Sequence, residues 1–196
     1  GKAEICGRCY VIDRKLCGLV LHEYWNLEED ERRLIHTKGD DILASYVTCF
    51  VALDRIRDPV NLGTIILTID AVAADGIILI DDCTDPFSVE SVRASMGAIF
   101  TLKISVCSSD EFLIFKQNFS GDVIGTALQS SSDYKQANWR RPCIILMGNE
   151  QAGLPATLRN ACDQLISMPM LGRSDSLNLS VATGIALYEY LRHQPS

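Results

Sequence analysis

The stretch ISMPMLGRSDSLNLSVATGIALYEYLRHQ, from Ile166 to Gln194, decides the fold, because it joins a strand, a polar loop and a long apolar helix without interruption. Leu165 to Met168 is a short apolar run that suits a buried strand, and Pro169 and Gly172 break that run. Asn178 is a favoured residue type at the position that begins a helix. The loop is therefore held at both ends, and we place the candidate active site there.

The predicted C-terminal helix is apolar over more than half of its surface. Its apolar positions are Leu179, Val181, Ala182, Ile185, Ala186, Leu187, Tyr188 and Tyr190. A helix with so wide an apolar surface is covered on two sides. One side can pack on the chain's own sheet. Because a single small domain rarely hides so wide a surface, we expect the other side to meet a second copy of the chain.

Strand-like and helix-like segments alternate along the chain, which favours an α/β fold with a mostly parallel, Rossmann-like sheet and helices on both faces. The predicted strands are Thr48 to Leu53, Gly76 to Ile80, Ile99 to Ile104, Asp122 to Ala127, Pro142 to Met147 and Gln164 to Met168. The predicted helices are Leu62 to Ala74, Ser88 to Met96, Ser109 to Asn118, Pro155 to Cys162 and Asn178 to Arg192.

The composition is that of one globular domain: 196 residues, of which 47% are apolar, with no apolar run long enough to span a membrane. The eight cysteines lie mostly in apolar runs, which is typical of reduced core thiols. We therefore expect a cytoplasmic protein, or one of an organelle matrix in a eukaryote. A zinc site could in principle use Cys6, Cys9, Cys17 and His22. The second pair has the wrong spacing, so we expect ordinary thiols and no metal.

Three segments resemble the signatures of the SpoU/TrmH class of SPOUT RNA methyltransferases. Asn61-Leu62-Gly63-Thr64 is similar to the first signature, Met147 to Leu154 to the second, and the strand, Pro-Met, loop, Ser-Leu-Asn and helix of the C-terminal stretch to the third. Their order and spacing agree with the family over about Val51 to Gln194. The resemblance implies a C-terminal deep trefoil knot. It also divides the chain into a SpoU-type domain at 44–196 and, at 1–43, an extension or the remnant of a preceding RNA-binding domain.

The cofactor that the resemblance implies is S-adenosylmethionine. Its adenine would lie in an apolar slot between loops, at positions that correspond here to Thr126, Gly148, Asn149, Met168 and Leu177. Asn149 and Glu150 would brace the loop or face the substrate. The residues alone leave an alternative, because Gly148 and Gly153 also suit ordinary turns.

The resemblance also implies a catalytic set beside the methyl group and the RNA ribose, which here comprises Asn61, Arg93, Glu150, Ser176 and Asn178. Ser176 could instead be a loop-ordering hydroxyl, and Asn178 a helix cap. For Asn178 both roles can coexist, because the cap uses an acceptor and the amide can still donate.

One position departs from the family. The Arg that usually stands four residues after the Gly of the first signature is Leu67 here. A Leu can neither donate a hydrogen bond nor stabilise an alkoxide, so another residue must act or the usual catalysis is lost. Arg57, Arg93 and Arg173 are the candidates for a replacement.

Two hypotheses follow. The first is an S-adenosylmethionine-dependent 2′-O-ribose methyltransferase that acts on ribosomal or transfer RNA as a homodimer. The second is a catalytically silent SpoU homologue that serves as an RNA-associated structural or assembly subunit. Leu67 and a net charge of −7, which is poorly suited to holding RNA unaided, favour the second. Glu150, Ser176 and Asn178 favour the first.

Overall fold

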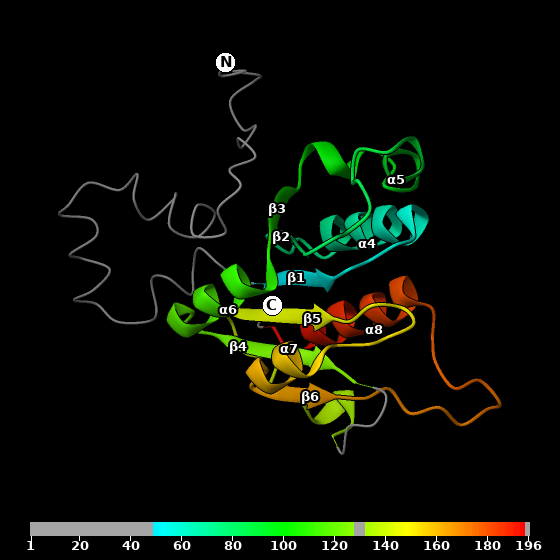
Figure 1. Cartoon of the computed structure of the whole chain (residues 1–196). Helices are drawn as coiled ribbons and strands as arrows, with labels where there is room; N and C mark the ends of the chain where they lie inside the picture. The colour runs from blue at the N-terminus through cyan, green and yellow to red at the C-terminus, as the bar shows by residue number, and fades with distance from the viewer. Residues whose placement is uncertain (1–48, 128–131, 195–196) are drawn as a thin grey trace.

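The computed structural model describes residues 49–127 and 132–194. Within these ranges, strands form one sheet in the order β3-β2-β1-β5-β4-β6 (Figure 1). The strands are β1 (Cys49–Asp54), β2 (Gly76–Ile80), β3 (Lys103–Cys107), β4 (Asp122–Thr126), β5 (Cys143–Met147) and β6 (Gln164–Ile166). Neighbouring strands are parallel throughout, so their carboxyl ends meet at one edge of the sheet.

Helices cover both faces of this sheet, which confirms the α/β prediction (Figure 1). They are α4 (Pro59–Ala71), α5 (Val89–Ala94), α6 (Ser109–Asn118), α7 (Ala156–Ala161) and α8 (Leu179–Arg192), with 3-10 turns η1 (Ala98–Phe100) and η2 (Tyr134–Gln136). The helices α4 and α8 share one core cluster with the sheet, and α6 and α7 share the other. None of the helices within the described ranges is long and apolar enough to cross a membrane.

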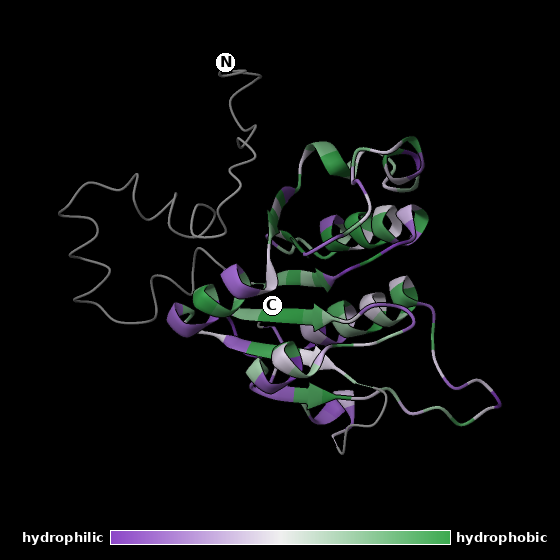
Figure 2. Cartoon of the chain, viewed as in Figure 1, coloured by the Kyte–Doolittle hydropathy of each residue, from purple (hydrophilic) through white to green (hydrophobic). Residues whose placement is uncertain are grey.

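The central strands are apolar because both of their faces are covered. In β1, Val51 and Leu53 face the α4 and α8 side, whereas Phe50 and Ala52 face the α6 side, and all four are buried. A strand buried on both faces reads as a continuous apolar run rather than an alternating one. Figure 2 shows this for β1 and β5, which are hydrophobic along most of their length.

The predicted strand from Ile99 to Ile104 is wrong in its first half. Gly97 adopts a positive φ of 93° and leads into η1, and β3 begins only at Lys103. The positive φ, which Gly adopts without steric cost, turns the chain there. Ile99 is buried in the core beside α4, so its apolar character reflects burial rather than an extended backbone.

Of the other predicted elements, β2 and α6 have the predicted bounds, and the rest are present with shifted ends. β6 stops at Ile166 instead of Met168, because Ser167 forms an isolated bridge with Asp133. The helices α5 and α7 are shorter than predicted. The candidate zinc ligands and the segment 1–43 lie outside the described residues.

The helices α4 and α8 begin at defined caps. The Asp58 carboxylate accepts hydrogen bonds from the backbone N–H groups of Val60 and Asn61, and Pro59 occupies the first turn of α4. Asn178 caps α8 in the same way. Caps of this kind satisfy backbone donors that have no partner within the helix, so they fix where α4 and α8 start.

Candidate functional site

A cavity of about 530 Å³ lies at the carboxyl ends of β4, β5 and β6. In the sheet register Thr126 pairs with Ile166, and both line the cavity. Its other walls come from the loop between β5 and α7, which we call the 148–154 loop, and from the segment that leads into α8. The carboxyl edge of a parallel sheet is the place where α/β domains bind ligands.

The structure brings the five predicted cofactor residues together in the wall of this cavity. They are Thr126, Gly148, Asn149, Met168 and Leu177, which come from β4, the 148–154 loop and the two ends of the segment between β6 and α8. Met147, Ile166 and Leu179 add buried apolar surface to the same wall. The cavity therefore combines an apolar lining with exposed loop backbone, the combination that suits a nucleoside-like ligand.

Gly148 is required by the shape of the 148–154 loop. A Cβ on Gly148 would lie 2.4 Å from the backbone C of Gly153 and 2.4 Å from the backbone N of Leu154. Gly153 closes the turn with φ of 65°, and its N–H donates to the carbonyl oxygen of Asn149 at 2.9 Å. Both glycines thus serve a turn, and that turn holds loop backbone against the cavity.

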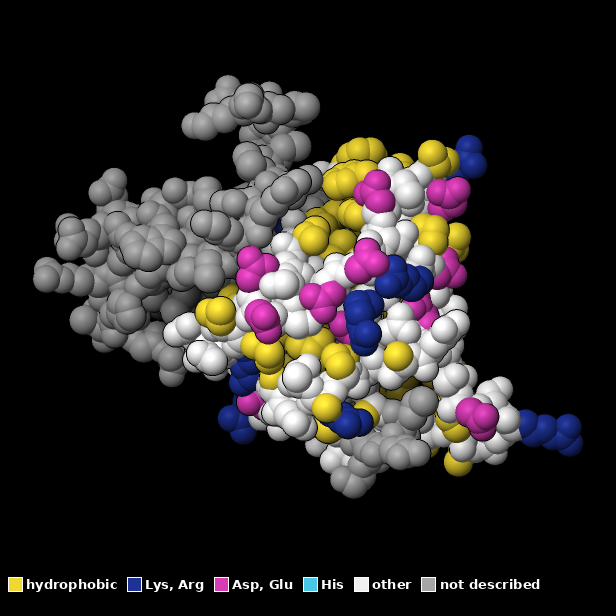
Figure 3. All heavy atoms as spheres, viewed as in Figure 1, with side chains coloured by type: hydrophobic (Ala, Val, Ile, Leu, Met, Phe, Trp, Pro, Cys, Tyr) yellow, Lys and Arg dark blue, Asp and Glu magenta, His cyan; other side chains and the backbone are white. Residues whose placement is uncertain are grey.

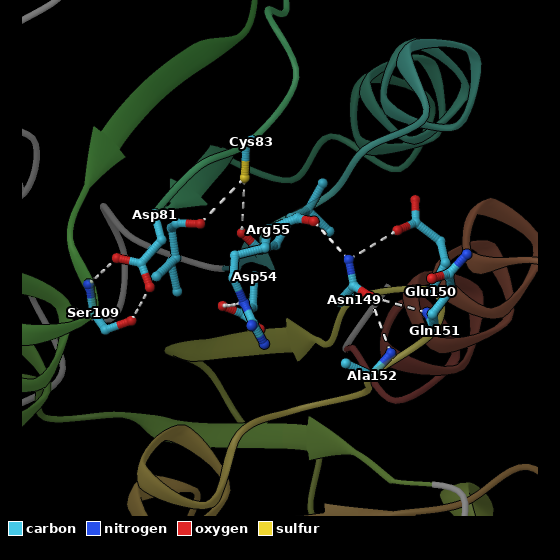
Figure 4. Close-up of polar contacts among 11 residues, drawn as sticks. Asp54, Arg55, Asp81, Cys83, Ser109, Asn149, Glu150, Gln151 and Ala152 are labelled. Atoms are coloured by element: carbon cyan, nitrogen blue, oxygen red, sulfur yellow. Dashed lines mark hydrogen bonds and ion pairs between the residues drawn. The ribbon is translucent and has the colours of Figure 1, made fainter.

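Asn149 braces the loop (Figure 4). Its Nδ2 donates to the carbonyl oxygen of Arg55 at 2.8 Å, and its Oδ1 accepts from the N–H groups of Gln151 and Ala152 at 3.0 Å. The neighbouring Glu150 is exposed at the cavity wall, with Oε2 at 3.4 Å from the Asn149 Nδ2. Of the two roles expected for this pair, Asn149 braces the loop, and the carboxylate of Glu150 is left at the cavity wall.

The end of β1 is held rigidly where Asn149 meets it (Figure 4). Arg55 has a positive φ of 49°, and its guanidinium pairs with the fully buried carboxylate of Asp54 at 2.8 Å. The hydrogen bond that Arg55 donates to Asp54 raises the pKa of Arg55. This ion pair fixes the turn after β1, and with it the carbonyl group that receives Asn149.

The thiol nearest to this turn is not a nucleophile at neutral pH. Burial raises the pKa of Cys83 to about 11, although hydrogen bonds with the backbone partly oppose the shift. Its Sγ donates to the carbonyl oxygens of Ile80 at 3.3 Å and Leu53 at 3.5 Å. Cys83 therefore packs the ends of β1 and β2 together as a neutral thiol.

A hydrogen bond joins the first and third signatures. The Nδ2 of Asn178 donates to the Oδ1 of Asn61 at 2.9 Å, and Asn61 is buried. The Oδ1 of Asn178 accepts from the N–H and Oγ of Ser180 and from the N–H of Val181. The acceptor of Asn178 is thus fully committed to capping α8, while its amide retains one N–H for a ligand.

Two of the remaining predicted catalytic residues, Ser176 and Glu150, line the cavity. The third, Arg93, is exposed on α5 and does not line it. Gly63 explains why α5 lies where it does, because a Cβ there would be 2.3 Å from the carbonyl oxygen of Ser91. The helix α5 therefore rests directly on α4, and Arg93 stays on the outer side of that pair.

The positions tied to the missing arginine lie outside the cavity. Leu67 is 36% exposed on the surface of α4. Arg57 forms an exposed ion pair with Asp82 at 2.7 Å, and Arg173 is exposed in the loop before α8. Neither arginine lines the cavity.

Sequence reasoning missed Arg159, which lines the cavity from α7. Its position one turn after the second signature gave no local signal, since a lone Arg on a short helix is usually a solvated charge. Among the residues described, no group of three or more His, Cys, Asp and Glu side chains is placed to hold a metal ion.

A parallel α/β domain with a ligand-sized cavity between loops at its strand ends defines a cofactor-binding class of protein. The chain belongs to the SpoU rRNA Methylase family, whose model matches residues 48–188. The resemblance to the SpoU/TrmH class is thereby confirmed.

Individual relatives agree with this assignment. The chain is 34% identical over 158 residues to the 23S rRNA (guanosine-2'-O-)-methyltransferase RlmB of Photorhabdus laumondii, covering 80% of this chain and 65% of the relative. It is 35% identical over 186 residues to the enzyme of the same name from Haemophilus influenzae, covering 93% and 76%. The AdoMet-bound rRNA methyltransferase from Sinorhizobium meliloti superimposes with a TM-score of 0.74 at 48% identity, covering 76% of this chain and 57% of that one. The chain thus spans between about half and three quarters of these relatives.

Proposed function

We propose that this chain is an S-adenosylmethionine-dependent methyltransferase that modifies the 2′-oxygen of a ribose in ribosomal RNA, with transfer RNA as the other substrate class. The observation that carries the proposal is the cavity at the strand ends, where the five candidate cofactor residues meet Glu150 and Ser176. The names of the relatives point to the same chemistry.

The residues present fit S-adenosylmethionine. A volume of about 530 Å³ is within the range of cofactor pockets. Gly148 allows the loop backbone to close on the ligand, and Met168 and Leu177 supply apolar contact for an adenine. When bound, the cofactor would supply an electrophilic methyl group on a sulfonium.

The side chains around the cavity would then orient the ribose and handle its proton. The hydroxyl of Ser176, in the cavity wall, can hold a ribose oxygen. Asn178 lies between the wall residues Leu177 and Leu179, and its cap of α8 fixes the direction in which its free N–H can donate to the ribose. The Glu150 carboxylate can accept the proton of the 2′-hydroxyl at Oε1 or Oε2. Holding both reactants in line supplies much of the rate enhancement in such transfers.

We propose that Arg93 contacts the RNA and does not contact the reacting atoms. Its guanidinium is exposed on α5, outside the cavity. In the face shown in Figure 3, basic and acidic side chains are mixed, without a continuous basic stripe. Because the net charge of the chain is −7, RNA affinity would also draw on a partner copy or on a domain that precedes residue 44.

We also propose the deep trefoil knot. Three contacts support it: α8 packs back on α4 and β5, the Nε2 of Gln194 donates to the carbonyl oxygen of Trp139 in the β4–β5 connection at 3.0 Å, and the N–H of Tyr134 in that connection donates to the carbonyl oxygen of Ser167 at 3.0 Å. The C-terminal segment thus lies against the connection that it would thread.

A homodimer through α8 is part of the proposal, as is a cytoplasmic location. Apolar side chains are exposed on α4 and on α8, two helices that pack against each other, and we call this set the α4–α8 face: Val60, Leu67, Val181, Tyr188 and Leu191. Val60 and Leu67 are seven residues apart on α4, and Val181 and Tyr188 are seven apart on α8, so each pair lies on one side of its helix. Exposed apolar side chains on two neighbouring helices suit burial against a second copy.

Leu67 favours the competing function, a silent RNA-associated subunit. Its place on the α4–α8 face gives the Leu a packing role in a dimer, without excluding loss of catalysis.

The experiment that separates the two functions combines calorimetry with S-adenosylmethionine and transfer of a labelled methyl group to 23S ribosomal RNA fragments. Saturable binding with ribose-specific labelling supports the enzyme. Cofactor binding without transfer to ribosomal or transfer RNA supports the silent subunit, and a folded protein that does not bind S-adenosylmethionine contradicts the enzyme.

A further inference from the structure

Arg159 is a basic side chain in the wall of the cavity that the proposed reaction does not yet use. Of the described residues that line this cavity, Arg159 carries its positive charge and Glu150 its negative charge. Within the described part of the chain, the Arg159 guanidinium has no ion-pair partner. An unpaired guanidinium beside an apolar ligand pocket is suited to bind an anionic group of the ligand.

The backbone beneath Arg159 is held firmly. Its neighbour Leu158 is fully buried in the core cluster shared with α6. A Cβ on Gly125 of β4 would lie 2.5 Å from the Sγ of Cys162, so the end of α7 packs closely on β4. Arg159 is thus attached to a fixed part of the wall, and only its own side chain needs to be ordered by a ligand.

The nearest acidic residue along the chain is already engaged. Asp163 accepts from the Nζ of Lys116 at 2.8 Å and from the N–H of Val123 at 2.7 Å. Asp163 is therefore engaged with other partners, and the guanidinium of Arg159 can bind a ligand in the cavity.

Arg159 also lies on a different side of the site from the candidate substrate residues. Asn61 and Asn178 belong to α4 and the start of α8, on one face of the sheet, whereas α7 packs on the opposite face. A group bound by Arg159 is accordingly a part of the cofactor rather than the ribose that Asn178 would hold.

We propose that Arg159 binds the carboxylate of the methionine tail of S-adenosylmethionine, and this inference rests on the proposed function. A planar guanidinium can hold a carboxylate through two parallel N–H donors, which an amide or an ammonium cannot reproduce. Arg159 is then a residue for cofactor affinity that leaves the adenosine part unaffected.

The test compares two ligands by calorimetry: S-adenosylhomocysteine, which carries the carboxylate, and 5′-methylthioadenosine, which lacks the amino acid tail. In the wild-type protein both bind, the first more tightly. Arg159→Gln is expected to weaken the binding of S-adenosylhomocysteine by about tenfold to a hundredfold and to leave the affinity for 5′-methylthioadenosine unchanged. Arg159→Lys should bind S-adenosylhomocysteine with an affinity between those of the wild type and Arg159→Gln. Arg141→Gln, which removes an exposed charge before β5 at the opposite edge of the sheet, is the matched control and should bind both ligands as the wild type does.

Equal affinity of Arg159→Gln and the wild type for S-adenosylhomocysteine overturns the proposal, and weaker RNA binding by the same variant would then assign Arg159 to a phosphate. Equal weakening of both ligands also overturns it, because a disturbed wall affects the adenosine part as well. A wild-type protein that binds neither ligand contradicts the proposed function itself.

Discussion

The side-chain amide of Asn178 donates from Nδ2 to the Oδ1 of Asn61 at 2.9 Å, across 117 residues of sequence. The orientation of both amides follows from the helix cap, because the Oδ1 of Asn178 must face the N–H groups of α8. The Nδ2 of Asn178 therefore points toward Asn61, which accepts this hydrogen bond with its Oδ1. Asn178 can therefore donate to a ribose oxygen, but it has no free acceptor with which to take a proton.

This arrangement allows capping and donation to be separated by mutation. Asn178→Asp keeps the cap and loses the amide donors, so we expect methyl transfer to fall at least about tenfold, with a stability cost of about 1–3 kcal/mol for the buried Oδ1 of Asn61 that loses its donor. Asn178→Ala loses the cap and leaves the buried Oδ1 of Asn61 without a donor, which should cost about 2–4 kcal/mol. Urea unfolding and single-turnover transfer measure the two effects, and an Asp variant with the wild-type rate would remove Asn178 from the reaction.

Gly148→Ala should abolish cofactor binding. The added Cβ would meet loop backbone at 2.4 Å, and backbone cannot move aside as a flexible side chain can. Gly172→Ala is the control, since nothing lies within 4 Å of a Cβ there. Calorimetric titration with S-adenosylmethionine compares the variants. Wild-type affinity in Gly148→Ala would show that the 148–154 loop can rearrange.

Leu67→Arg tests what the missing guanidinium does. The side chain is 36% exposed, so the substitution should fold. Because Leu67 lies on the α4–α8 face, light scattering first establishes that the variant is still a dimer; in the dimer we expect the rate of methyl transfer to rise by about tenfold or more, through stabilisation of the alkoxide. Leu67→Lys adds the charge without the planar donor pair and should gain less. A rate that is unchanged in both variants would mean that another group already fills this role.

The stability of the protein should depend on pH through Asp163. Burial acts to raise the pKa of this carboxyl, but the hydrogen bonds from Lys116 and from the N–H of Val123 outweigh it, and the pKa is lowered. A carboxylate with a lowered folded-state pKa stabilises the fold at neutral pH, and this stabilisation is lost as the pH falls below about 4 and through the folded-state value. In Asp163→Asn the fall in unfolding free energy over this range should be shallower. An unchanged slope would argue that Asp163 is solvated.

Tyr188→Glu should dissociate the proposed homodimer, because it places a charge on the α4–α8 face, where Tyr188 is 56% exposed. Ile114→Glu on α6 is the matched control, with 56% exposure on the other side of the sheet. Light scattering after size exclusion gives the mass of each variant. Dissociation by both variants, or by neither, would place the interface elsewhere.

Much of the fold could be predicted from local patterns. Apolar runs located β1, β2 and β5, since strands covered on both faces must be apolar along their length. Asn178 marked the start of α8 because a cap is a local interaction. The same reasoning failed at Ile99, where an apolar residue serves the core from a 3-10 turn. A buried residue is apolar whether it lies in a strand or in a turn, so the sequence alone does not distinguish the two.

The sequence identified most of the site residues through motifs. Their roles, however, depend on contacts between segments that are distant in the sequence. Asn149 was open to bracing or to substrate contact, and its hydrogen bond to Arg55 assigned it to bracing. Gly63 belongs to a signature, yet its lack of a side chain serves the contact between α4 and α5. Arg159 carries no motif, and only its place in the cavity wall draws attention to it.

The sequence by itself determined the family, the alternation of strands and helices, and the residue that caps α8, because burial and capping act within a few positions of the chain. The tertiary structure decided which of those residues share one cavity, that Asn178 donates to Asn61, and that Arg93 remains outside the cavity. These relationships join elements more than a hundred residues apart or on different helices. No local preference encodes them, because they arise only when the sheet brings its carboxyl ends together.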